Sequence, residues 1–195
     1  MKTPHDRNKE KQLSQRAVVI GAGIAGLLAA AALSRAVPQA QVILLDRDAV
    51  PDGPENRRGV PQGRHAHLLM AGGWSAMELL FTKSVRERLF EAGAHEISMS
   101  NGMLALAPDA GWFRRYRRNG SGMITCTRSL LDWVVRESLM DDTTNVSIHQ
   151  AAVDGLKPVP TLFPAVSVSI SRLVGTNRHA FRRGGEFRHK EKTSD

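Results

Sequence analysis

The feature that most constrains this fold is a glycine pattern that directly follows an apolar run near the amino end. Residues 18–20 are β-branched and of strand length, and Gly21, Gly23 and Gly26 then form a G-x-G-x-x-G pattern. Residues 24–33 are nearly all Ala, Leu and Ile, which favours a helix packed against a sheet. A strand, a glycine turn and a helix in this order predict the start of a nucleotide-binding βαβ unit.

An acidic residue completes the pattern. Residues 41–45 are a second apolar run, and Asp46 ends it, 20 positions after Gly26. Gly21 permits the tight turn, Gly23 lets a pyrophosphate approach the backbone, and Gly26 lets helix and strand pack closely. Asp46 can accept hydrogen bonds from the adenosine ribose and would repel a 2′-phosphate, so FAD or NAD is expected rather than NADP.

Residues 17–33 have an alternative interpretation as the core of a signal peptide, with small residues near Ala36 as the cleavage site. That interpretation explains the alanines but neither the three glycines in register nor Asp46. The polar leader before the run contains Asp6 and Glu10, and the run is short for a membrane span. We therefore expect neither secretion nor a membrane partner.

The net charge of +8 lies at the two ends of the chain. Residues 1–16 carry five basic and two acidic side chains, and residues 158–195 carry seven basic and three acidic ones. The remaining 15 basic and 14 acidic side chains belong to residues 17–157. Basic ends of this kind are typical of solvated chain, so nucleic acid is not expected as the partner. The prediction is a flexible leader over residues 1–15 and a disordered or unrelated tail over 158–195.

The sulfur and imidazole groups predict no reactive or metal site. Cys126 is the only cysteine, so an intramolecular disulfide is impossible and a reducing, cytoplasmic location is expected. It lies in an apolar run, which favours a small core residue over a nucleophile. His65 and His67 have no third ligand at a suitable spacing nearby, so no metal site is expected.

A long loop follows Asp46. Three prolines, three glycines and several charges argue against regular structure up to His67. A loop beyond the carboxyl end of a strand lies where an open α/β sheet binds ligands. Arg58, Gln62 and Arg64 are therefore candidate contacts to the cofactor, and the alternative is an ordinary solvated loop.

The remaining elements are predicted from the spacing of apolar residues and from the glycine and capping residues that mark helix ends. They are a helix over 65–81 that Gly72-Gly73 interrupts, a helix over 85–92, a weak strand in 96–107, a strand over 123–126, a helix capped by Thr127, and a strand over 145–153 beside the first. The aromatic and basic run 112–118 is interpreted as a solvated strand edge, with base stacking as the alternative. Arg128 stands in the first helical turn against the dipole, which indicates an anionic partner such as a cofactor phosphate.

Together these motifs resemble the N-terminal part of an FAD-dependent monooxygenase of the aromatic-hydroxylase and epoxidase class, particularly its actinobacterial-type members. Besides the glycine pattern, the matching segments are residues 44–48, 57–69, 111–113 and 127–137, and the resemblance spans about residues 16–157. It implies that Asp46 holds the FAD ribose, that Arg47 lies near the adenine, and that Arg64 and Arg128 contact the cofactor. It also implies that NADPH reduces the flavin and that O₂ then supplies an oxygen atom to an alkene or an aromatic ring.

The predicted fold is α/β, an incomplete Rossmann-like doubly wound parallel sheet over residues 16–157. Members of the family are about twice as long or longer, and their second FAD motif, Asp-Gly motif and substrate domain are not found after Lys157. The chain is thus expected to be a truncated form that is inactive alone or that needs a second chain to complete its fold. The alternatives are an NAD-dependent oxidoreductase and a non-catalytic nucleotide-binding or interaction module. No catalytic residue and no substrate can be assigned.

Overall fold

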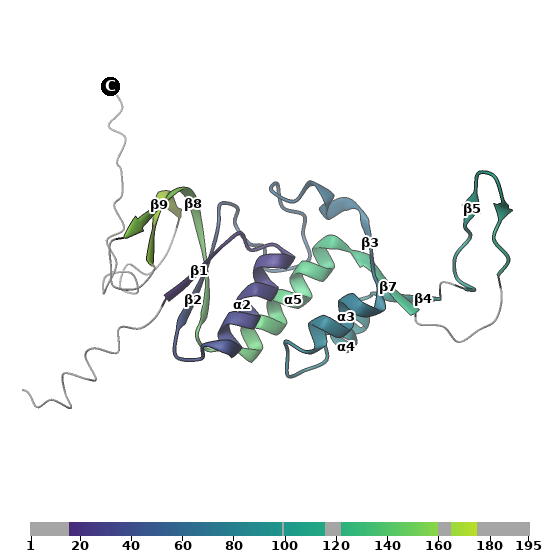
Figure 1. Ribbon diagram of the computed structural model, residues 1–195, viewed down its shortest axis with the longest axis horizontal. Coiled ribbons are helices and arrows are strands. Elements are labelled where there is room, and N and C mark those ends of the chain that lie inside the picture. The colour runs from purple at the N-terminus through teal and green to yellow at the C-terminus, as the bar shows by residue number, and fades with distance from the viewer. Residues whose placement is uncertain (1–15, 99, 116–121, 160–164, 175–195) are drawn as a thin grey trace, which may run out of the picture. The chain divides into compact units, whose positions relative to one another are not determined.

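The computed structural model describes residues 16–98, 100–115, 122–159 and 165–174 (Figure 1). The chain divides into two compact units. The first unit combines Met1–Val50 with Thr143–Asp195, and the second unit is Pro51–Asp142. The second unit is thus inserted into the sequence of the first.

The first unit is built on a four-stranded sheet. Its strands, in spatial order, are β1 (Arg16–Ile20), β2 (Gln41–Asp46), β8 (Val146–Val159) and β9 (Ala165–Val174). The pairs β1–β2 and β2–β8 are parallel, and β9 runs antiparallel to β8. The helix α2 (Ile24–Ala36) joins β1 to β2 and contacts both strands (Figure 1). The predicted Rossmann-like α/β fold with a parallel sheet is therefore confirmed.

The place of the third parallel strand corrects one prediction. The strand expected over 145–153 was placed beside the first strand, whereas β8 pairs with β2, with Val42 opposite Val146. The reason lies in β2, whose residues Val42, Ile43, Leu44 and Leu45 are all buried. Such a continuous apolar run is typical of an inner strand of a parallel sheet, which is covered on both faces, and β8 is the second neighbour of β2.

The core of the first unit lies on both faces of this sheet. On one side, α2 presents Leu27, Ala30 and Ala31, and the small side chains of the two alanines let the helix approach the strands closely. A second cluster joins Ile43 and Leu45 of β2 to Ala151 of β8 and Val168 of β9. The sheet therefore continues past residue 157, where the sequence placed the end of the domain. The predicted leader over 1–15 and most of the predicted tail lie outside the described residues.

The second unit contains a small antiparallel sheet and three helices. The sheet has the order β3 (Ala66–Leu69), β7 (Gly122–Thr127) and β4 (His95–Ser98). The helices are α3 (Ala71–Glu78), α4 (Val85–Glu91) and α5 (Arg128–Asp142). A short 3₁₀ helix, η1 (Pro61–Arg64), contacts α5, and β5 (Leu106–Ala107) and β6 (Gly111–Trp112) form a hairpin (Figure 1).

Two sequence predictions in this unit are wrong in detail. The helix expected over 65–81 begins only at Ala71, because residues 66–69 pair with β7 as a strand instead. Gly72 and Gly73 neither end nor interrupt it, since both lie in its first turn. The loop after Asp46 is irregular over most of its length, but η1 and the start of β3 give its last part regular structure.

Other elements follow the sequence closely. The helix α4 ends before Gly93, whose φ of +101° marks the left-handed turn that glycine adopts most readily.

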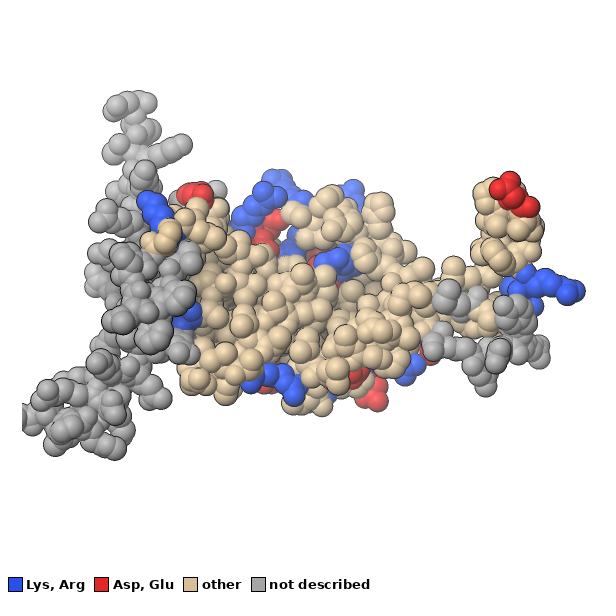
Figure 2. All heavy atoms as spheres, in the orientation of Figure 1, with Lys and Arg blue, Asp and Glu red and all other residues tan. Residues whose placement is uncertain are grey.

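Within the described residues, no helix is both long enough and apolar enough to cross a bilayer. Figure 2 shows Lys and Arg in small groups, with Asp and Glu among them, over a mostly uncharged face.

Candidate functional site

The glycine loop of the first unit turns the chain sharply from β1 into α2. Gly21 has a φ of +97°, a backbone conformation that side chains other than glycine's rarely adopt. Its N–H group donates a hydrogen bond of 2.7 Å to the carbonyl oxygen of Leu45, which fixes the loop against the end of β2. The turn therefore depends on glycine at this position, as the sequence predicted.

Gly26 is required because of close backbone contact. A Cβ atom at this position would overlap the carbonyl oxygen of Gly21, and it would also come within 3.4 Å of the Val19 side chain. Because the obstacle includes backbone, a small rotation of a side chain cannot relieve it. The first turn of α2 must therefore lie directly on the loop, as the third glycine of the pattern predicts.

The start of α2 is left open for an anion. The helix begins at Ile24 after Gly23, which has an extended backbone, and the N–H group of Leu27 makes the first helical hydrogen bond, to the Gly23 carbonyl. No side chain caps this end, and the first turn contains no acidic residue. The N–H groups before Leu27 have no partner inside the helix, so this end can bind a phosphate.

Asp46 lies directly at this loop. Its Oδ2 atom accepts a 2.7 Å hydrogen bond from the N–H group of Ala22, and Oδ1 accepts a 3.0 Å bond from the N–H group of Asp48. The carboxylate thus joins the glycine loop to the end of β2. The sequence predicted Asp46 as a ribose ligand and did not anticipate its contact with the loop.

Arg47 follows Asp46 and points mainly into solvent, with 74% of its side chain exposed. Its carbonyl oxygen accepts a 3.2 Å hydrogen bond from the side chain of Gln150 on β8. Gln150 was not identified from the sequence, because only the pairing of β2 with β8 brings it opposite Asp46. In the first unit the structure therefore brings together Gly21, Gly23, Gly26, Asp46 and Arg47.

The other predicted contacts belong to the second unit. Arg58, Gln62 and Arg64 are all exposed, the last two on η1. Arg128 begins α5, and 14% of its side chain is exposed. Their joint action with the glycine loop at one cofactor remains a prediction.

Arg128 has an anionic partner within its own chain. Its Nε atom donates a 2.8 Å hydrogen bond to Oδ1 of Asp132, one turn later on α5. The Nη2 atom of Arg57 lies 3.7 Å from Oδ2 of the same carboxylate. The spacing from Arg128 to Asp132 suits an ion pair on a helix and could have been read from the sequence, whereas Arg57 could not be distinguished there from Arg58.

The helix α5 otherwise begins as predicted. The hydroxyl oxygen of Thr127 accepts a hydrogen bond of 3.2 Å from the N–H group of Leu130, which is the expected cap. Its buried apolar residues are Leu131, Val134, Val135 and Leu139, while Leu130 is only partly buried.

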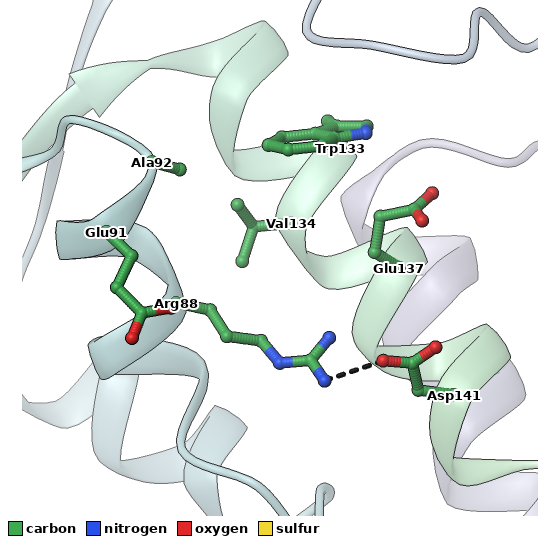
Figure 3. Close-up of a pocket in the computed structure, with 7 residues that line it drawn as sticks. All are labelled: Arg88, Glu91, Ala92, Trp133, Val134, Glu137 and Asp141. Carbon is green, nitrogen blue, oxygen red and sulfur yellow. Dashed lines mark hydrogen bonds and ion pairs between the residues drawn. The ribbon is translucent and has the colours of Figure 1, made fainter.

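A surface pocket of about 480 Å³ lies between α4 and α5 (Figure 3). The ion pair between Arg88 and Asp141, with a distance of 2.6 Å, spans it. The indole N–H of Trp133 donates a 2.9 Å hydrogen bond to the carbonyl oxygen of Asp52. The pocket is formed by helix sides and contains no glycine loop, so it does not match the predicted cofactor site.

The thiol and imidazole groups are placed as follows. Cys126 is half-buried on β7, and burial raises the pKa of its thiol, which disfavours the nucleophilic thiolate. No group of three His, Cys, Asp or Glu side chains within the described ranges could hold a metal ion. Neither observation gives these residues a chemical role.

The parallel sheet and the glycine loop are those of a Rossmann-like fold. Residues 19–68 match the family described as the NAD(P)-binding Rossmann-like domain. Over 65 residues the chain is also 51% identical to Protein Rv3254 of Mycobacterium tuberculosis (strain ATCC 25618 / H37Rv). That match covers 33% of this chain and 13% of Rv3254.

Solved structures extend the likeness to most of the chain. The p-nitrophenol 4-monooxygenase PnpA from Pseudomonas putida DLL-E4 matches with a TM-score of 0.53 and 19% identity, over 80% of this chain and 37% of PnpA. The flavin-dependent monooxygenase PieE, solved with FAD and substrate, matches with a TM-score of 0.52 and 20% identity, over 81% of this chain and 27% of PieE. The Diels-Alderase PyrE3 matches with a TM-score of 0.50 and 17% identity, over 83% of this chain and 30% of PyrE3.

These matches show which fold the chain has. It is the fold of a part of flavin-dependent monooxygenases, as the resemblance in the sequence predicted. The chain spans little more than a third, or less, of the length of these structures. Because PyrE3 is named for a different reaction, the fold alone does not specify the chemistry.

Proposed function

We propose that this chain binds FAD and forms the cofactor-binding part of a flavin-dependent monooxygenase. The observation that carries the proposal is the hydrogen bond of 2.7 Å from the Ala22 N–H group to Asp46. It puts the carboxylate and the open start of α2 at the same loop, as a dinucleotide requires. The pyrophosphate would bind the N–H groups at the start of α2, and the adenosine ribose would bind Asp46.

The residues present fit such a ligand. Gly23 gives the pyrophosphate access to the backbone, and Gly26 keeps the helix close to the strand. The carboxylate of Asp46 would repel a 2′-phosphate, which favours FAD or NAD over NADP. The complex of the similar PieE with FAD supports FAD as the resident cofactor. Arg47 is proposed to lie near the adenine, and Arg58, Gln62, Arg64 and Arg128 are proposed as further contacts.

A bound flavin would supply the redox chemistry, accepting reducing equivalents from NAD(P)H and activating O₂. The described residues bind and orient this group. The proposed reaction is hydroxylation or epoxidation of a small organic molecule, and it belongs to the longer proteins that this chain matches in part. A cytoplasmic location and a second chain that completes the fold are part of the same proposal.

The test is an absorption spectrum of the purified chain from 300 to 550 nm, after mixing with FAD and desalting. Flavin bands that remain with the protein would support the proposal. Asp46→Asn should weaken retention, because it removes the charge that the ribose and the loop share. Asp109→Asn is the matched control, because it removes an exposed carboxylate from the second unit. A colourless wild-type protein under these conditions would contradict FAD binding.

The second candidate is an NAD-dependent oxidoreductase, which the match to an NAD(P)-binding domain favours. Competition separates the two: NAD⁺ that displaces FAD at equal concentration would favour this alternative. Retention of neither nucleotide would favour a non-catalytic interaction module. The exposed apolar side chains of the β5–β6 hairpin would then be its candidate contact surface; they belong to Leu106 and Trp112 and to the neighbouring Leu104 and Phe113.

A further inference from the structure

One carboxylate in the second unit lies between two guanidinium groups. Asp132 accepts a hydrogen bond of 2.8 Å from Nε of Arg128 through one oxygen, and its other oxygen lies 3.7 Å from Nη2 of Arg57. The three side chains are almost enclosed, with 11% of Asp132, 14% of Arg128 and 8% of Arg57 exposed. Charges this far from water interact more strongly than an ion pair at the surface.

The placement of Arg128 requires an explanation. It is the first residue of α5, where the positive end of the helix dipole opposes a cation. Thr127 already caps this end by accepting the N–H of Leu130. The carboxylate of Asp132, one turn further on, compensates the charge of Arg128 and fixes the direction of its side chain.

The contact with Asp132 uses only part of the Arg128 guanidinium. The hydrogen bond engages Nε, and within the described residues this side chain makes no other hydrogen bond or ion pair. The two terminal Nη groups therefore remain for a ligand. A planar pair of N–H donors held in a fixed direction suits the oxygen atoms of a phosphate.

We propose that Asp132 is a positioning residue that holds Arg128 to bind a phosphoanion. This inference rests on the proposed function where the anion is the pyrophosphate of FAD. The same chemistry would also bind a free pyrophosphate ion. Asp132 itself does not touch the ligand.

The sign of one substitution separates positioning from simple charge. Asp132→Asn removes a negative charge near the anion, so Coulomb's law alone predicts tighter anion binding. If Asp132 positions Arg128, the same substitution loosens the guanidinium and weakens binding. We expect the dissociation constant for FAD to rise about tenfold, which corresponds to the loss of one charged hydrogen bond.

The experiment measures FAD and riboflavin binding to the full chain by flavin fluorescence. Riboflavin has no phosphate, so its dissociation constant should not change in Asp132→Asn. The matched control is Asp141→Asn, which removes another arginine-paired carboxylate from the same helix and should change neither constant. Equal weakening of FAD and riboflavin, or unchanged or tighter FAD binding, would overturn the proposal.

Two further measurements cover a failure of folding or of FAD binding. Asp132→Glu keeps the charge but moves the carboxylate by one methylene group, so it should also weaken FAD and not riboflavin; unchanged FAD binding would count against positioning. If the wild type binds no FAD, the proposed function fails, and inorganic pyrophosphate becomes the probe. The inference would be supported if pyrophosphate raises the melting temperature of the wild type and of Asp141→Asn but not that of Asp132→Asn. It would be overturned if pyrophosphate does not raise the melting temperature of the wild type, or raises that of all three proteins equally.

Discussion

The helices α2 and α5 each follow a strand, and they begin in opposite ways. At the β1–α2 junction no side chain caps the helix, and three glycines leave the backbone without side chains at their positions. At the β7–α5 junction Thr127 caps the helix, and Arg128 and Asp132 form an ion pair over its first turn. We propose that the first junction binds an anion through its backbone and the second through a side chain.

The two junctions should therefore be sensitive to opposite kinds of substitution. The backbone site fails when atoms are added, because its close contacts leave no room for them. The side-chain site fails when groups are removed, because nearly buried charges then lose their partners. Substitutions at the two junctions test this difference, and they are considered from the largest expected effect to the smallest.

Gly26→Ala should have the largest effect. The added Cβ would overlap the Gly21 carbonyl oxygen, so the free energy of unfolding should fall by at least about 3 kcal/mol and FAD retention should be lost. Urea unfolding followed by circular dichroism measures the first effect. Gly72→Ala is the control, because nothing lies within 4 Å of its Cβ position; it should be neutral or stabilising by up to about 1 kcal/mol. Equal losses in the two variants would contradict the role of the close contact.

Asp132→Ala should come next. It leaves Arg57 and Arg128 without their shared carboxylate in a nearly buried place, so a loss of about 3 kcal/mol is expected in the same unfolding experiment. Asp141→Ala removes an exposed ion pair from the same helix and should cost far less. If the two variants lose the same stability, the enclosed ion cluster has no special role.

Thr127→Ala should cost about 1 kcal/mol, because it removes the hydroxyl that accepts the Leu130 N–H group. Thr127→Ser keeps that hydroxyl and should retain most of the stability. Thermal melting of both variants beside the wild type gives the comparison. A serine variant as unstable as the alanine variant would show that the methyl group matters and the cap does not.

Gly23→Ser should have the smallest effect on stability, and of the opposite sign. Gly23 has an extended backbone that serine adopts easily, and a serine there could cap α2. The free energy of unfolding should rise by a few tenths of a kcal/mol, about 0.3. FAD binding should weaken, because the side chain takes the place of the phosphate. Tighter FAD binding in this variant would argue against backbone recognition.

The same contrast explains how much of the molecule the sequence predicts. The glycine loop, its strand and helix, and Asp46 follow from local spacing, and the structure has them in the predicted order. The partner of Arg128 was also within reach, since Asp132 stands four positions later. Local spacing gives the elements and the pairs within one helix.

What the sequence could not give depends on pairing between distant segments. Residues 66–69 have helical spacing, but β7 takes them as a strand. Arg57 and Arg58 are equivalent in the sequence, and only the fold turns Arg57 toward Asp132. Gln150 gains its contact with Arg47 because β8 lies beside β2 and not beside β1. Residues of the same type that the sequence cannot distinguish thus acquire different contacts only in the folded structure.

The insertion of the second unit has a consequence for the order of folding. During synthesis β1, α2 and β2 emerge first, but β8 leaves the ribosome only after the whole of Pro51–Asp142. Closing a flexible loop of that length costs about 4 kcal/mol of chain entropy, and a second unit that is already folded brings its two ends to fixed places and so removes much of that cost. The nascent βαβ segment thus keeps one edge of β2 unpaired at least until β8 has been synthesised.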